Sequence, residues 1–166
     1  MRAAAVVVCV ALAAPVNAQP ARDDGGEPAA KVEDRPNAIY VEALGKGGVW
    51  GVGYERHLAK WLGLGGVASF TMLDGQRMYS LTPYVLVYPL RSGSHGMFVD
   101  GGANLIRIDT PSPVPEWDGM SESGIGAELS AGYEYRGKLL FRFYVQAVAG
   151  KSGVAPWGGA SIGWTL

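Results

Sequence analysis

Four carboxylates and one arginine of this 166-residue chain alternate with glycine, serine or other small and polar residues. In a β-strand alternate residues share one face, so these charged side chains would gather on the polar face of a sheet. Burying a carboxylate is costly unless it is paired, so the pattern predicts an internal network of ion pairs and hydrogen bonds. Its predicted members are Glu55, Asp100, Asn104, Glu128, Glu134, Arg142 and Gln146. The carboxylates outnumber Arg142, and we expect Arg136 and Lys138 to help near the rim.

Only two histidines are present, His57 and His95. A histidine beside a serine can act as general base for a nucleophile, and His95 follows Ser94 and lies near Ser92. This pairing would suit a lipid-modifying enzyme. Both histidines fall in predicted turns, where a histidine without a catalytic role is much commoner, so we expect no catalysis.

Two further patterns resemble ligand sites. Residues 63–68 match the G-x-G-x-x-A dinucleotide fingerprint, which needs a helix after it, but here a turn follows. The acidic residues between positions 23 and 34 lack the spacing of a calcium loop. We therefore expect neither a cofactor nor a metal.

The elements that would position these residues are eight amphipathic β segments. Each opposes an apolar face to a small or polar one, and most are about ten residues long, as a tilted strand needs in order to cross a bilayer. In lipid, strands can span only when the sheet closes on itself. The fold prediction is an all-β, eight-stranded, antiparallel, up-and-down transmembrane β-barrel. The predicted segments are 38–45, 49–56, 61–71, 78–88, 97–108, 124–135, 139–149 and 157–166.

Loop lengths predict the orientation of this barrel. Turns 57–60, 89–96 and 136–138 would face the periplasm, and the longest connection, 109–123, would face outward. Trp117 in that connection is a candidate contact for a surface partner. Pro83 interrupts a predicted strand, and a local bulge would resolve it.

The N-terminus predicts export. Residues 1–18 have the charged start, the short apolar run and the small-x-small ending of a signal peptide. Residues 19–36 predict a disordered lead-in, and residues 37–166 the barrel domain. Cleavage would remove Cys9, which leaves no thiol chemistry. A net charge of −1 gives no support for nucleic-acid binding.

The last strand and the eight segments resemble a known group, the small eight-stranded outer-membrane β-barrel proteins of Gram-negative bacteria, of the OmpA-barrel/OmpX type. The tract 47–56 is similar to the first hairpin of such proteins. In this group the last strand is the signal read by the barrel-assembly machinery, and it usually ends in an aromatic residue, where this chain has leucine. The corresponding residues here are Ala160, Ile162, Trp164 and Leu166.

We therefore expect an outer-membrane barrel with a structural or surface-interaction role and a lumen plugged by polar side chains. Expected partners are outer-membrane lipid, periplasmic chaperones and the assembly machinery, and the surface partner stays open. The alternatives are a lipid-modifying enzyme, a narrow pore and a soluble periplasmic barrel that binds an apolar ligand as lipocalins do.

Overall fold

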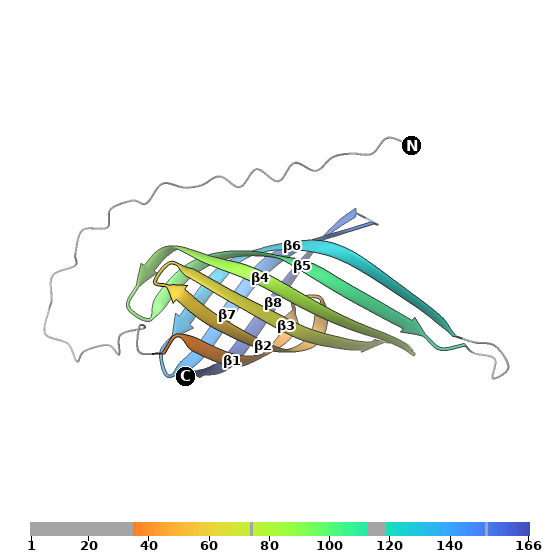
Figure 1. The fold of residues 1–166 in the computed structure, drawn as a ribbon, viewed down its shortest axis with the longest axis horizontal. Helices are drawn as coiled ribbons and strands as arrows, with labels where there is room; N and C mark the ends of the chain where they lie inside the picture. The colour runs from red at the N-terminus through yellow and green to blue at the C-terminus, as the bar shows by residue number, and fades with distance from the viewer. Residues whose placement is uncertain (1–34, 74, 113–118, 152) are drawn as a thin grey trace, which may run out of the picture.

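Eight antiparallel strands, joined in sequence order, close into one barrel (Figure 1). The structure is a computed structural model that describes residues 35–73, 75–112, 119–151 and 153–166. The predicted signal peptide and nearly all of the predicted lead-in lie outside these residues. The strands are β1 Asn37–Gly45, β2 Gly48–Ala59, β3 Leu62–Leu73, β4 Gln76–Ser92, β5 His95–Thr110, β6 Met120–Arg136, β7 Leu139–Gly150 and β8 Gly153–Thr165.

The seam between β1 and β8 closes the barrel. It pairs six residues of each strand, from Ala38 with Thr165 to Ala43 with Ala160. Backbone bonds between Asn37 and Leu166, 3.2 and 2.8 Å long, extend the seam to its end. Figure 1 shows the start of β1 and the C-terminus at the same end, here named the terminal end. The opposite end, with the long connection 111–119, is named the loop end.

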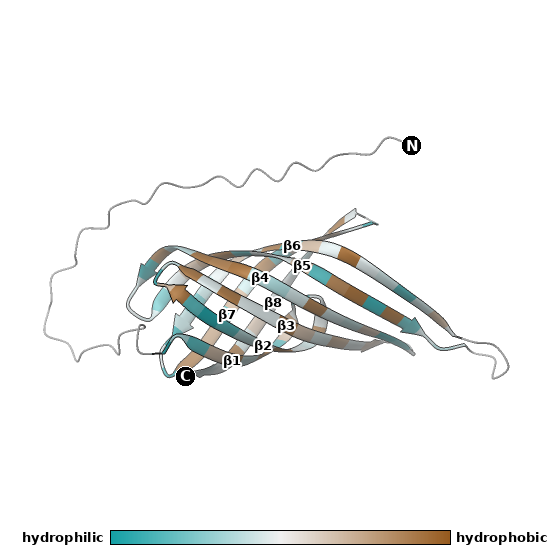
Figure 2. Cartoon of the chain, in the orientation of Figure 1, coloured by the Kyte–Doolittle hydropathy of each residue, from teal (hydrophilic) through white to brown (hydrophobic). Residues whose placement is uncertain are grey.

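Alternation along each strand separates two chemistries. On β1, Ile39 and Val41 are 48% and 52% exposed on the outside, whereas Tyr40 and Glu42 are buried inside. The same parity holds along the other strands, except at the starts of β6 and β8, where residues 120–123 and 153–158 are exposed on both faces. In Figure 2 hydrophobic and hydrophilic residues interleave along β5. The predicted facing of the segments is therefore confirmed.

One outward row of paired residues spirals around the whole wall. It begins at Met97 on β5 and returns to the same strand at Arg107, ten residues further on. With eight strands, this stagger implies a strand tilt of roughly 40°. Ten residues at that tilt rise about 25 Å along the axis, which is the height of the apolar band of outer-membrane barrels. The row is Met97, Tyr133, Phe143, Ala160, Ala43, Trp50, Phe70, Tyr79 and Arg107.

Strand ends and turns differ from the prediction in three places. The turns at the terminal end are shorter than predicted, because β2 continues to Ala59 and β4 to Ser92. His57 is therefore a strand residue and not a turn residue. The connection predicted at 109–123 spans only 111–119 in the structure, because β5 and β6 extend past the rest of the wall (Figure 1).

Pro83 causes no bulge, so that part of the prediction is wrong. It pairs with Gly66 on β3, and the register with β5 is the same before and after it. Proline lacks an N–H, and around Pro83 the pairs with β5 lapse at residues 82 and 83 without a change of register. The register shift in β4 lies instead between Val87 and Leu90.

Candidate functional site in the barrel interior

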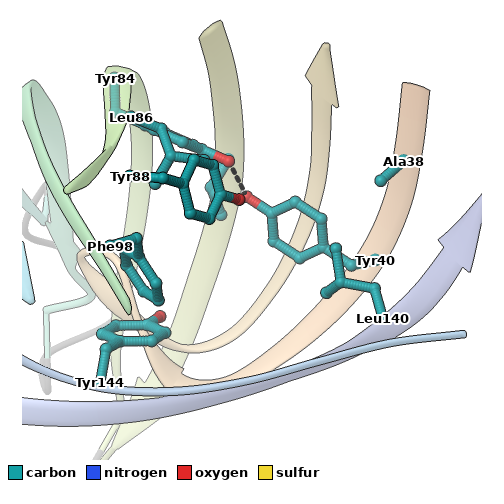
Figure 3. Close-up of a cluster of buried hydrophobic side chains, with 9 residues drawn as sticks. Ala38, Tyr40, Tyr84, Leu86, Tyr88, Phe98, Leu140 and Tyr144 are labelled. Carbon is teal, nitrogen blue, oxygen red and sulfur yellow. Dashed lines mark hydrogen bonds between the residues drawn. The ribbon is translucent and has the colours of Figure 1, made fainter. Parts of the chain in front are cut away.

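Aromatic rings form a layer across the interior. The hydroxyls of Tyr40 and Tyr84, from opposite parts of the wall, meet at 2.7 Å (Figure 3). Phe98 packs edge-on against both Tyr88 and Tyr144. The sequence had suggested a polar interior, but part of the interior is aromatic. The hydroxyls of Tyr84, Tyr88 and Tyr144 donate to glutamates, while their rings fill space.

A four-residue ion cluster lies on the terminal side of this layer. Arg142 on β7 donates to Glu55 at 2.7 Å, and its Nε donates to Glu134 at 3.0 Å. Arg136 donates to the other oxygen of Glu55 at 2.8 Å. Two carboxylates thus face two guanidinium groups, so the charges balance, and all four side chains are buried. We call Glu55, Glu134, Arg136 and Arg142 the terminal cluster.

Neutral donors complete the terminal cluster. Tyr84 donates to Glu55 at 2.9 Å and Tyr88 donates to Glu134 at 2.6 Å. The His57 ring lies 3.0 Å from Glu55, and Arg91 lies 3.2 Å from the other ring nitrogen of His57. Each glutamate therefore has several donors, which is the condition under which a buried carboxylate is tolerated.

A second cluster is centred on Lys46, the first residue of the turn between β1 and β2. Its ammonium lies 2.5 Å from Asp100, 3.0 Å from Glu128 and 3.2 Å from Ser130. It also lies 4.8 Å from the centre of the Tyr84 ring. We call Lys46, Asp100, Glu128 and Ser130 the Lys46 cluster.

The turn that carries Lys46 is folded into the barrel. Ser69 and Ser80 donate to the Lys46 carbonyl at 2.8 and 3.4 Å, and Glu42 accepts its backbone N–H at 2.6 Å. Gln146 donates to the Gly45 carbonyl at 3.0 Å. Strands β3 to β7 thus each supply a side chain to this turn. Gly47 has a φ of 76° and Leu44 a φ of 52°, which bend the chain inward.

Several buried polar atoms around the Lys46 cluster have no protein partner among the described residues. Both amide atoms of Asn104 are unpaired, as are one oxygen of Asp100, the Gln146 oxygen and the second oxygen of Glu128. Asn104 is fully buried. The Lys46 cluster is therefore less completely satisfied than the terminal cluster.

Glycines make room for the aromatic rings. A Cβ added at Gly53 would collide with the Tyr40 ring, and one at Gly65 with the Tyr84 ring. Gly159 faces Tyr144 in the same way. The abundance of glycine on the inward face thus has a packing cause.

All seven predicted network residues lie inside the barrel, and the structure joins Glu55, Glu134 and Arg142 as one unit. Asn104 is buried there without a hydrogen-bond partner among the described residues. Arg136 helps as expected, whereas Lys138 is exposed. Sequence reasoning missed Lys46, Glu42 and His57. The alternation of segment 38–45 already placed Glu42 on the polar face, whereas segment 49–56 ended one residue before His57. Nothing in the pattern indicated that the Lys46 turn folds inward.

The two histidines lie apart. Ser92 and His95 pair across the β4–β5 hairpin, and the His95 Nδ1 is hydrogen-bonded to the Tyr133 hydroxyl, whereas His57 is buried in the terminal cluster. Residues 63–68 lie within β3, and β3 continues straight into its turn with β4. Within the described residues no group of three or more histidine, cysteine or acidic side chains could hold a metal ion. No helix in that part of the chain is long and apolar enough to cross a membrane.

The loop end has its own exposed contacts. Asp109 accepts from Ser121 at 2.7 Å and from Arg107 at 3.0 Å, and these partners lower the pKa of Asp109. They tie the ends of β5 and β6 together. Trp117, the candidate contact residue, lies outside the described residues.

Comparison with known proteins gives the fold alone. No protein-family model and no curated protein matches the chain. Among solved structures it is similar to the N-terminal β-barrel domain of OprF from Pseudomonas aeruginosa, with a TM-score of 0.59 and 9% identity. The match covers 78% of this chain and 95% of the OprF domain. The chain therefore shares the closed, eight-stranded β-barrel fold of the OprF domain.

Proposed function

We propose that the chain is an integral outer-membrane protein with a structural or surface-interaction role, without catalysis, whose lumen is plugged by its own side chains. The observation that carries this proposal is the distribution of chemistry across the wall. Large apolar side chains such as Trp50, Phe143 and Val145 are more than half exposed, while the ionic groups are buried. A protein surrounded by water rarely exposes so much contiguous apolar surface.

The plug is supported by the two clusters and the aromatic layer. An eight-stranded barrel is just wide enough to be filled by side chains, and here rings, ion pairs and an inward turn occupy that width. The outer-membrane location is supported by the fold shared with the OprF domain and by the apolar band of about 25 Å. A soluble lipocalin-like barrel would need the opposite placement of its apolar residues.

Membrane fractionation followed by gel electrophoresis of boiled and unboiled protein tests the proposal. We expect the chain in the outer-membrane fraction, with a faster band when it is not boiled. A soluble chain with one mobility under both conditions would exclude an integral barrel.

A narrow pore is the second candidate, and the unpaired atoms near Lys46 favour it. Buried polar atoms of this kind usually bind water, and a file of waters could admit small ions. Planar-bilayer recording separates the two candidates. The plugged barrel gives no steady conductance in potassium chloride, whereas discrete current steps would support the pore.

A further inference from the structure

We propose that Glu33 and Asp34 bind Arg91 at the mouth of the terminal end and supply a counter-ion that the barrel itself lacks. Both acids directly precede Arg35, the first described residue. The contact extends the plug proposed above to the terminal end. It does not depend on insertion of the barrel into a membrane.

Guanidinium groups at the terminal end outnumber the carboxylates that face them. The terminal cluster balances two of each. Arg91 adds a third guanidinium group, which lies 3.2 Å from Nδ1 of His57 and donates to the Lys60 carbonyl at 3.1 Å. Neither of these partners is a carboxylate. One positive charge is therefore uncompensated among the described residues.

Two buried nitrogen atoms at this mouth have no hydrogen-bond partner among the described residues. They are Nη2 of Arg91 and Nε of Arg136. Arg136 is only 2% exposed, so water reaches little of its guanidinium group. A charged donor that is buried and unpaired is costly, and a carboxylate, which only accepts hydrogen bonds, is its strongest partner.

The chain enters the barrel beside both arginines. The Pro36 carbonyl accepts from the Arg136 guanidinium at 3.2 Å and from the His57 backbone N–H at 2.8 Å. The ring of the same His57 lies 3.2 Å from Arg91. An extended chain covers at most about 3.6 Å per residue, so the two acids are tethered within roughly 11 Å of Pro36.

The distribution of charge favours an acidic occupant of this mouth. The acidic side chains that are not buried in the described part of the chain, Asp109 and Glu122, both lie at the loop end. Residues 19–34 carry five acidic and two basic side chains, and their attachment at Pro36 keeps the acids at a high local concentration. The exposed or half-buried basic residues of the terminal end are Arg35, Arg56, Lys60, Arg91 and Lys138.

A double-mutant cycle in detergent micelles tests the pair. Urea titration of the folded chain, with residues 19–34 retained, measures the unfolding equilibrium constant. We expect Glu33→Gln with Asp34→Asn to raise this constant about fivefold, as the loss of a well-formed, partly exposed ion pair does. In the Arg91→Gln background the same two changes should have no effect, because the partner is already gone.

Asp23→Asn with Asp24→Asn is the matched control. It removes the same charge from the same segment, but further from the barrel, and should leave the constant unchanged. Equal effects of the two acid pairs would overturn the proposal. A loss that persists in the Arg91→Gln background would place the acids on another cation and would also overturn it.

Inorganic phosphate, compared with sodium chloride at equal ionic strength, tests whether the mouth serves a free anion instead. We expect phosphate to stabilise the chain only when Glu33 and Asp34 are neutralised. Equal stabilisation of the wild type would contradict an occupied mouth. A wild-type chain that shows the heat-dependent mobility shift and no conductance, but no coupling to Arg91, refutes only this inference. A soluble chain that shows the coupling refutes only the membrane location.

Discussion

The ammonium of Lys46, in the inward turn between β1 and β2, lies 2.5 Å from Asp100 on β5, although the two residues are separated by 54 positions in the chain. This contact holds the turn between β1 and β2 inside the barrel. The same turn takes β1 out of the wall at Leu44, so the first residues of β8 pair with β7 but have no partner on β1 among the described residues.

Lys46→Met tests that contact. The change removes the cation that faces Asp100 and Glu128, and breaking a buried pair in this way costs about 3 kcal/mol of unfolding free energy. Urea titration in detergent micelles measures the loss. Lys138→Met is the control, since Lys138 is exposed at the terminal end and its loss should change stability by less than about 0.5 kcal/mol. Equal stability of the two variants would show that Lys46 does not anchor the turn.

Glu55→Gln tests the terminal cluster. Glu55 binds Arg136, Arg142 and Tyr84, so the neutral variant leaves two guanidinium groups with Glu134 as their main counter-ion. We expect a loss of about 3–5 kcal/mol in the same titration. Glu122→Gln, at an exposed position of β6, serves as the comparison and should be close to neutral. A Glu55 variant as stable as the Glu122 variant contradicts a paired interior.

Gly53→Ala tests the packing of rings on glycine. The added methyl group would collide with the Tyr40 ring, and overpacking of this kind costs about 1–3 kcal/mol. Gly124→Ala is the matched change, because its methyl group would meet no atom within 4 Å. We expect only the Gly53 variant to melt at lower temperature. Equal melting temperatures for the two variants would show that Gly53 is not needed to make room for the Tyr40 ring.

The sequence predicts most of this fold because successive residues of each strand face the lumen and the outer surface in turn, and the two faces need side chains of different chemistry. Parity assigned Glu55, Glu134 and Arg142 to one surface, and burial forces such residues to pair. The length of each segment predicted the barrel, since a short strand cannot cross a bilayer.

Other features were not predictable, because they depend on contacts between distant strands. The Lys46 turn has the residues of an ordinary exposed turn, and its inward bend depends on Ser69, Ser80 and Gln146. His57 looked like a turn residue because β2 shifts register between His57 and Ala59, and this shift interrupts the regular alternation of the strand before its end. Pro83 needed no bulge, because the ladder to β5 lapses without a change of register.

Methyl NMR in lipid nanodiscs tests the central claim, that apolar side chains outside the barrel face acyl chains while the interior is closed. A doxyl-labelled phospholipid broadens the methyl groups that it reaches. Leu81 and Val85 lie on the outer face of β4, whereas Val67, Leu86 and Leu140 are buried inside. We predict that the doxyl lipid broadens the methyl signals of Leu81 and Val85 and leaves the three interior residues sharp. Sharp outer signals, or broadening of Val67, Leu86 and Leu140, would contradict the account.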